Sequence, residues 1–251
     1  MSGRKEKIIS AFIFAVLLVV VVYLAIVSNE KGTKHQITMI DISGNSLLSK
    51  RDYLEFTKLD DLHSDKDLLL SVIKSRFQKH PYIDFADVEY LGKGKVTVSL
   101  TEKKIKAVLL GGKDPFLISE NYEVLPLFMN TKFIAIPVIS NCPGIKNFKP
   151  MTRQKTADLV EAFKIIDAAN YVDVDLSKNL SEIDLKDGGD ILLSFAGMKA
   201  PVIFGRGEEA EKIVYLDALW KRETDANKFI NESRYIDLRF NHAVYLGLLE
   251  K

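Results

Sequence analysis

The distribution of apolar and polar residues divides the chain into three parts. Ile8 to Val27 form an apolar run without a single charged residue. A helix of that length is about 30 Å long, which is the thickness of the hydrocarbon core of a bilayer. Two stretches with the patterns of strands and helices follow, at 36–104 and 105–251. The sequence therefore predicts a transmembrane helix at 8–27 and two folded domains after it.

The charges that flank the apolar run predict its orientation. Arg4, Lys5 and Lys7 precede the run, so the positive-inside rule places the tail 1–7 in the cytoplasm. The alternative is a cleaved signal peptide, but the run is long for one and Ala25-Ile26-Val27 is a poor cleavage site. We expect a single-pass protein of the cytoplasmic (inner) membrane. Its linker at 28–35 and its folded part then lie in the periplasm or outside the cell.

The pattern at 36–104 predicts a small α+β domain. Ile40 and Ile42 alternate with polar residues and indicate a half-buried strand. Helical patterns follow around 49–56 and 67–79, and a hairpin with a Gly-containing turn is expected at 83–101. The predicted order of elements is strand, helix, helix, strand, strand. In such a domain, the two helices can cover one face of a three-stranded sheet.

The pattern at 105–251 predicts a mixed α/β domain with an extended, mainly antiparallel sheet. Its two helices are expected at 152–169 and 205–222. Short runs of apolar residues between Gly, Asn and Asp turns indicate strands, which are expected at 107–110, 116–119, 124–127, 180–185, 191–195, 202–204 and 234–246.

Several short motifs resemble a known family. The motifs of the first domain resemble a POTRA domain; they are Ile40-x-Ile42-x-Gly44-Asn45, His80-Pro81-Tyr82-Ile83 and Thr101-Glu102-Lys103. Tyr235-x-Asp237-Leu238-Arg239-Phe240 resembles the C-terminal signature of the FtsQ/DivIB family of bacterial cell-division proteins. The chain departs from the family pattern at Ile105, where proline is common, and at Phe240, where tyrosine is frequent. The resemblance covers nearly the whole chain in architecture, with 36–104 as the POTRA domain and 105–251 as the FtsQ-type β domain.

The resemblance implies a non-enzymatic scaffold of the divisome at the septum. Its implied partners are division proteins of the FtsB and FtsL types, and more widely of the FtsK, FtsW and FtsI types. A strand of the FtsB-type partner is implied to pair near the C-terminal end, because an edge strand exposes unpaired N–H and C=O groups. The residues implied to contact the partner are Arg239, Phe240, Val244 and Tyr245.

The roles of these residues depend on the course of the last strand. If 234–246 is continuous, Phe240 and Val244 share the core-facing parity with Ile236, whereas a bulge or turn at Asn241-His242 would shift it. For Arg239, a salt bridge within the domain competes with partner contact. For Phe240, core packing is the favoured role.

Composition and motifs narrow the range of functions. The formal net charge is +1, with 35 Lys+Arg and 34 Asp+Glu, and gives no electrostatic footprint for nucleic acid. The single Cys142 excludes an internal disulfide. We find no His-x-x-x-His, Gly-x-Ser-x-Gly or Ser-x-x-Lys motif, and therefore expect no enzyme, cofactor, metal or small-molecule substrate. Two alternatives remain open: a POTRA-containing chaperone or secretion component for outer-membrane proteins, and an anchored cell-wall enzyme.

Overall fold

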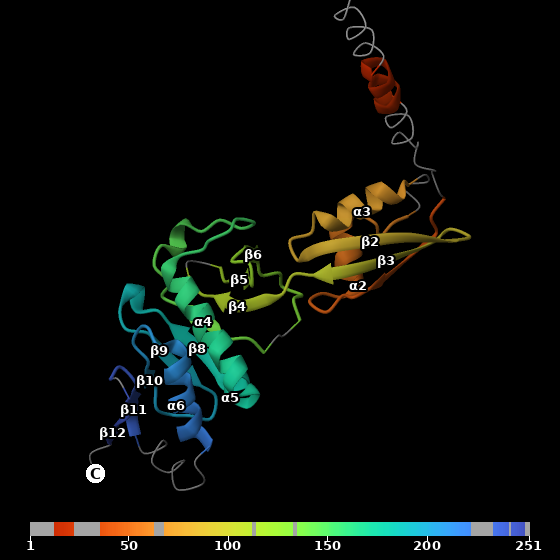
Figure 1. The fold of residues 1–251 in the computed structure, drawn as a ribbon. Helices are drawn as coiled ribbons and strands as arrows, with labels where there is room; N and C mark the ends of the chain where they lie inside the picture. Colours follow the sequence, from red (N-terminus) through yellow and green to blue (C-terminus); the bar gives the residue numbers. More distant parts are fainter. Residues whose placement is uncertain are drawn as a thin grey trace, which may run out of the picture.

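The protein folds into two sheet-containing parts that follow one another along the chain (Figure 1). The computed structural model describes residues 13–22, 36–62, 68–111, 114–132, 135–221, 233–240 and 242–248. Its class is α+β with a three-stranded sheet and a mixed nine-stranded sheet.

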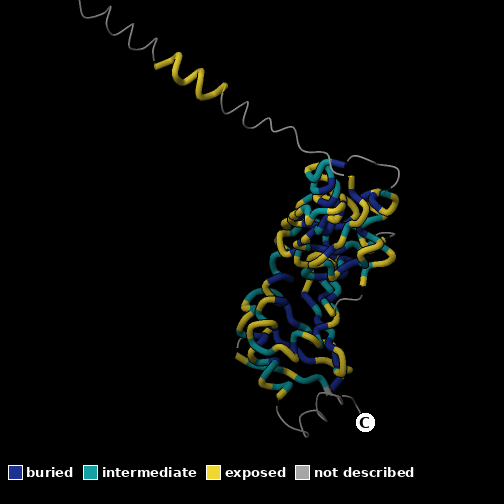
Figure 2. The backbone as a smooth tube through the Cα atoms, turned by 90° about the vertical axis from the view of Figure 1, so that its right-hand side faces the viewer, coloured by how far each residue is buried: buried dark blue, intermediate teal, exposed yellow. Residues whose placement is uncertain are grey.

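The expected transmembrane helix is not borne out by the described residues. Within 8–27 the structure describes helix at 13–22, and every residue of this segment is exposed (Figure 2). No helix in the described ranges is both long and apolar enough to cross a membrane. The predicted fold class, which included such a helix, is corrected accordingly; 1–12 and 23–35, including the expected tail and linker, lie outside the described residues.

The first part has the predicted order of elements. Its three strands lie in the order β1-β3-β2, with β1 parallel to β3 and β2 antiparallel to it. Gly44 ends β1 with a φ of +78°, and a Cβ there would lie 2.1 Å from the carbonyl oxygen of Leu100, so this position requires glycine. The elements are β1 (Met39–Ser43), α2 (Lys50–Thr57), α3 (Leu70–Gln78), β2 (Ile83–Gly92) and β3 (Lys95–Glu102).

The helices of the first part bury one stripe each against the sheet. Ile73 and Phe77, which the helical pattern places on one face, are fully buried on α3. Tyr53 of α2 and Val98 of β3 are also fully buried in this core. Ser49 and Asp52 form a capping box that begins α2.

The second part is built on the nine-stranded sheet, in the order β12-β11-β10-β9-β8-β7-β4-β5-β6. The pairs β10–β11, β7–β8 and β4–β7 are parallel, and the others are antiparallel. The strands are β4 (Ile105–Leu109), β5 (Phe116–Ser119), β6 (Val124–Pro126), β7 (Val138–Ser140), β8 (Leu180–Asp184), β9 (Leu192–Phe195), β10 (Val202–Ile203), β11 (Ser233–Asp237) and β12 (Tyr245–Leu248). The helices are α4 (Ala157–Val172), α5 (Val174–Asn179) and α6 (Glu209–Lys221).

The helices α4 and α6 pack against the sheet and form its core. Ile166 of α4 and Ile213 of α6 are buried together with alternate strand residues such as Ile139, Ile183 and Ile236. Both helices begin later than the sequence indicated. Thr156 caps α4 by accepting a hydrogen bond from the Leu159 N–H, and the positive φ angles at Gly205 and Gly207 delay the start of α6.

The two parts are joined by a packed contact. Leu117 and Leu125 of the nine-stranded sheet are buried in the core of the first part. The Tyr82 hydroxyl is 2.9 Å from the carbonyl oxygen of Pro126, and the Lys132 N–H donates to the Leu47 carbonyl at 2.8 Å. These contacts hold the segment after β6 on the surface of the first part.

Candidate functional site

The strand β12 is the edge of the nine-stranded sheet at the end away from the first part (Figure 1). The other edge, β6, is covered, because Val124 exchanges backbone hydrogen bonds with 151–152 on its outer side. No residue of the described part pairs with the outer side of β12. Within the described ranges, β12 is therefore an open edge of the sheet.

Charge distinguishes β12 from the edges of the three-stranded sheet. On β1, the Asp41 carboxylate accepts the Ile42 N–H at 3.0 Å and pairs with Lys50, while β2 carries the exposed acids Asp84, Asp87 and Glu89. Charged side chains at an edge discourage the pairing of another strand. The sequence of β12, Tyr-Leu-Gly-Leu, has no charge. Of the edges that the structure describes, β12 therefore suits strand addition best.

The hydrogen-bond pattern identifies which backbone groups of β12 face outward. The Ile236 N–H donates to the carbonyl of Pro201, just before β10, and the Leu238 N–H donates to the carbonyl of Ile203 in β10. Asp237 lies between these two residues, so its backbone groups point to the other side, toward β12. Asp237 pairs with Tyr245, and Ile236 pairs with Leu246. Because successive residues of a strand face opposite neighbours, the N–H and C=O of Leu246 face the open edge.

The chain reverses between β11 and β12. The two strands are antiparallel neighbours, with Asp237 opposite Tyr245, so 234–246 is a hairpin and not one continuous strand. His242 has a φ of +58° in the connecting segment, and the Ala243 N–H donates to the Phe240 carbonyl at 3.4 Å. Asn241 lies outside the described residues. The alternation of core-facing and outward-facing residues that was expected along one continuous strand therefore ends at Leu238.

Arg239 is held by two carboxylates at the start of this turn. Its guanidinium lies 2.6 Å from Asp237 and 2.9 Å from Asp190. The hydrogen bond from Arg239 lowers the pKa of the Asp237 carboxyl and so keeps it ionised. The salt bridge within the domain, one of the two roles considered for Arg239, is thus present. The Arg239 side chain remains 42% exposed, and its contact with a partner stays a prediction.

Phe240 and Tyr245 lie together on the surface. Their rings form an edge-to-face pair with centroids 4.7 Å apart, and the two residues are 51% and 54% exposed. The expectation that Phe240 packs in the core is therefore wrong, because the turn carries it out of the sheet. Val244 is half-buried and packs against the core of the nine-stranded sheet. The structure thus brings Arg239, Phe240 and Tyr245 to the surface at one end of β12.

Four further residues shape this surface and have only weak signals in the sequence. The exposed Tyr235 ring covers Gly247, where a Cβ would lie 2.4 Å from it. Gly205 has a φ of +67°, and a Cβ there would lie 2.7 Å from the Arg239 Cγ. Asp190, in the turn before β9, is the second partner of Arg239. Alternation along β11 predicted an outward Tyr235, but nothing in the sequence paired Arg239 with 190 or 205.

The described part of the chain brings together no metal-ligating cluster, and its buried His80 and Cys142 carry no charge at neutral pH. No group of three or more His, Cys, Asp or Glu side chains in these ranges is placed to hold a metal ion. Burial lowers the pKa of His80 to about 4, and burial raises the pKa of Cys142 to about 11. At neutral pH both groups are therefore uncharged, and the thiol is a poor nucleophile.

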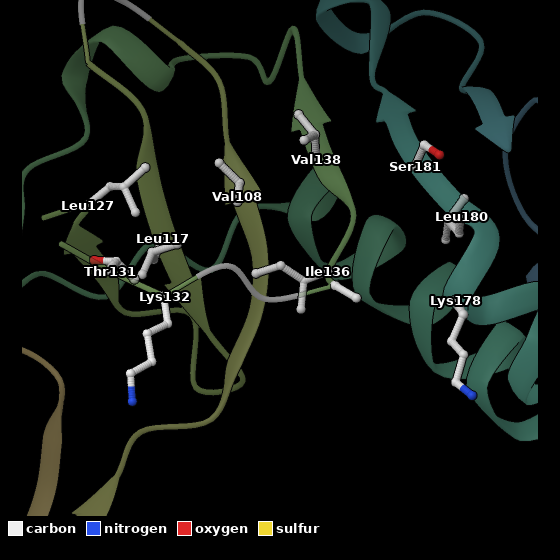
Figure 3. Close-up of a pocket in the computed structure, with 11 residues that line it drawn as sticks. Val108, Leu117, Leu127, Thr131, Lys132, Ile136, Val138, Lys178, Leu180 and Ser181 are labelled. Carbon is white, nitrogen blue, oxygen red and sulfur yellow. The ribbon is translucent and has the colours of Figure 1, made fainter. Parts of the chain in front are cut away.

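A groove of about 580 Å³ opens on strands β4, β5, β7 and β8 (Figure 3). Its floor is apolar, with Val108, Leu117 and Val138, and two lysines, Lys132 and Lys178, stand at its sides (Figure 3). Residues 133 and 134, which follow Lys132 in the chain, lie outside the described part, so no binding role is assigned to the groove.

No protein-family model matches this sequence, and no curated protein is significantly similar to it.

Proposed function

We propose that this chain is a non-enzymatic scaffold of the bacterial division machinery, which recruits proteins of the FtsB and FtsL types. The observation that supports the proposal best is the edge of β12. It is uncharged, uncovered in the described part, and flanked by the exposed rings of Phe240 and Tyr245. The class of partner is inferred from the motif at 235–240, because this motif resembles the C-terminal signature of the FtsQ/DivIB family.

The physical basis of recruitment is the addition of a partner strand. Main-chain hydrogen bonds to Leu246 provide affinity without sequence specificity, and side-chain contacts provide specificity. The rings of Phe240 and Tyr245 offer apolar area of the kind that anchors interfaces, beside the Arg239 charge. Arg239 is fixed by its two carboxylates, so a partner would meet it in a preformed position.

A strand of four residues makes few hydrogen bonds, and the affinity expected from this edge alone is modest. Partners held at one membrane surface compensate for modest affinity, because confinement raises their effective concentration. The proposed location is therefore the outer side of the cytoplasmic membrane at the septum.

Depletion of the protein in its own bacterium tests this proposal. Over several doublings, we expect smooth filaments with segregated chromosomes and no septa, and a wild-type copy supplied in trans should restore division. Cells that divide normally but become permeable to large antibiotics would contradict the division role. That outcome would favour the chaperone or secretion alternative.

A further inference from the structure

A second concave surface lies where the two parts of the protein meet. It is a pocket of about 300 Å³ between α2 and the segment that follows β6. This volume is at the low end for ligand sites, so it suits one or two side chains better than a cofactor. The residues that line it are Leu48, Asp52, Glu55, Phe56, His80, Phe128, Met129 and Asn130.

The wall contributed by 127–132 is held in place by hydrogen bonds. The Asn130 side-chain amide donates to Asp52 at 2.7 Å, and the Phe128 N–H donates to the Tyr82 hydroxyl at 3.2 Å. The same hydroxyl lies 2.8 Å from Thr131 Oγ1. The pocket is thus preformed, and a ligand would not have to order this segment.

Three aromatic rings form the inner surface of the pocket. The Phe56 centroid is 4.3 Å from that of His80 and 6.2 Å from that of Phe128. Phe56 is 45% exposed and Met129 fully exposed, although both are large and apolar. Apolar residues left open around a small pocket are typical of protein-binding surfaces, and methionine adapts to varied partners.

The charges at the rim are negative. Asp52 and Glu55 are the ionisable acids of the lining, and no lysine or arginine of the described part lines the pocket. Asp52 is engaged by Ser49 and Asn130. Glu55 pairs with Arg51 at 2.7 Å, but the two side chains are 47% and 86% exposed, and such surface pairs are weak and easily exchanged.

We propose that this pocket binds a basic side chain, arginine or lysine, presented by an extended segment of a partner protein. The aliphatic stem packs between Phe56 and Met129, and the cation lies against the rings and faces Glu55. Aromatic faces attract cations, and a guanidinium or ammonium with an apolar stem matches a pocket that is apolar inside and acidic at its rim. The site is separate from the β12 edge and does not depend on a role in division.

The proposal is tested with the full chain in a mild non-ionic detergent and four short peptides. The peptides have the sequence acetyl-Gly-Leu-Xaa-Leu-Gly-amide, with arginine, lysine, norleucine or glutamate as Xaa. The methyl signal of Met129, labelled with ¹³C and assigned with a Met129→Leu variant, reports binding. Phe56→Ala and Glu55→Gln alter the pocket. Their matched controls are Phe85→Ala and Glu89→Gln, which alter exposed residues on β2.

We expect saturable shifts with the arginine and lysine peptides, and weaker binding of the other two. Phe56→Ala should weaken the arginine peptide about fivefold and Glu55→Gln about threefold, with both controls unchanged. Thermal unfolding midpoints near that of the wild type would show that the variants remain folded. Equal binding of the norleucine peptide, equal effects of the controls, or no saturable shift at millimolar peptide would each overturn the proposal.

Discussion

Replacement of Leu246 by proline is the sharpest test of strand addition at β12. The N–H of Leu246 faces the open edge, and Tyr245 and Gly247 on either side pair with β11. Proline at this position removes one outward donor and places its ring at the edge, while the bonds between β11 and β12 are retained. The residue before a proline favours extended backbone, which Tyr245 already has in β12.

The matched control is Leu246→Ala. Leu246 is half-buried against the core, so both variants lose this packing, at a cost of about 1–2 kcal/mol in the free energy of unfolding. Only the proline variant also loses the outward N–H. One hydrogen bond contributes about 0.5–1.5 kcal/mol net, and the proline ring additionally obstructs a neighbouring strand. We therefore expect the partner to bind the proline variant about tenfold more weakly than the alanine variant.

The assay is isothermal titration calorimetry, which measures the affinity of the full chain for an extended segment of the FtsB-type protein from the same bacterium. Circular dichroism and the thermal midpoint of each variant establish that the fold is retained. If the proline and alanine variants bind the segment equally, the partner does not pair with the outer side of β12. The recruitment mechanism would then be wrong even if depletion blocks division.

Three further outcomes are expected. Arg239→Glu should weaken partner binding and lower the thermal midpoint in calorimetry, because it places a third carboxylate beside Asp190 and Asp237. An unchanged midpoint would contradict a stabilising role of these two ion pairs. The folded-state pKa of His80, about 4, lies below its unfolded value of about 6.5, so the unfolded state binds more protons between these values. The free energy of unfolding should therefore fall as pH drops from about 6.5 to 4, and urea titrations of His80→Gln should lack this contribution. In urea unfolding, Gly44→Ala should destabilise the protein by about 1–3 kcal/mol more than Gly92→Ala. Both glycines have a positive φ, but only a Cβ at Gly44 would meet a backbone oxygen. Equal losses in the free energy of unfolding would refute the steric argument.

The order of elements could be read from local patterns. Alternation at Ile40 and Ile42 and the stripe of Ile73 and Phe77 reflect one-sided burial, which is a local property of a strand or helix. The helix at 8–27 was predicted on a different ground, an uncharged apolar run of membrane-spanning length, and the transmembrane helix was wrong for the described residues.

The candidate site was predicted only in part. The sequence located the segment 234–246 and its polar and aromatic residues, but not the reversal between Asp237 and Tyr245. Phe240 was assigned to the core because parity was extended through a turn. The strand β11 ends at Asp237, so Phe240 lies in the turn, where the alternation on which the assignment rested no longer applies.

The sequence by itself determined most of the strands and helices and which of their faces are apolar, because these depend on residues a few positions apart. It missed the short elements β7 and α5. The tertiary structure alone decided that β12 is an open edge and β6 a covered one. It also decided that Arg239 meets Asp190, and that Phe56 and Phe128 share a pocket. These residues lie far apart in the chain. The strand order of the nine-stranded sheet brings Arg239 to Asp190, and the contact between the two parts of the protein brings Phe56 to Phe128.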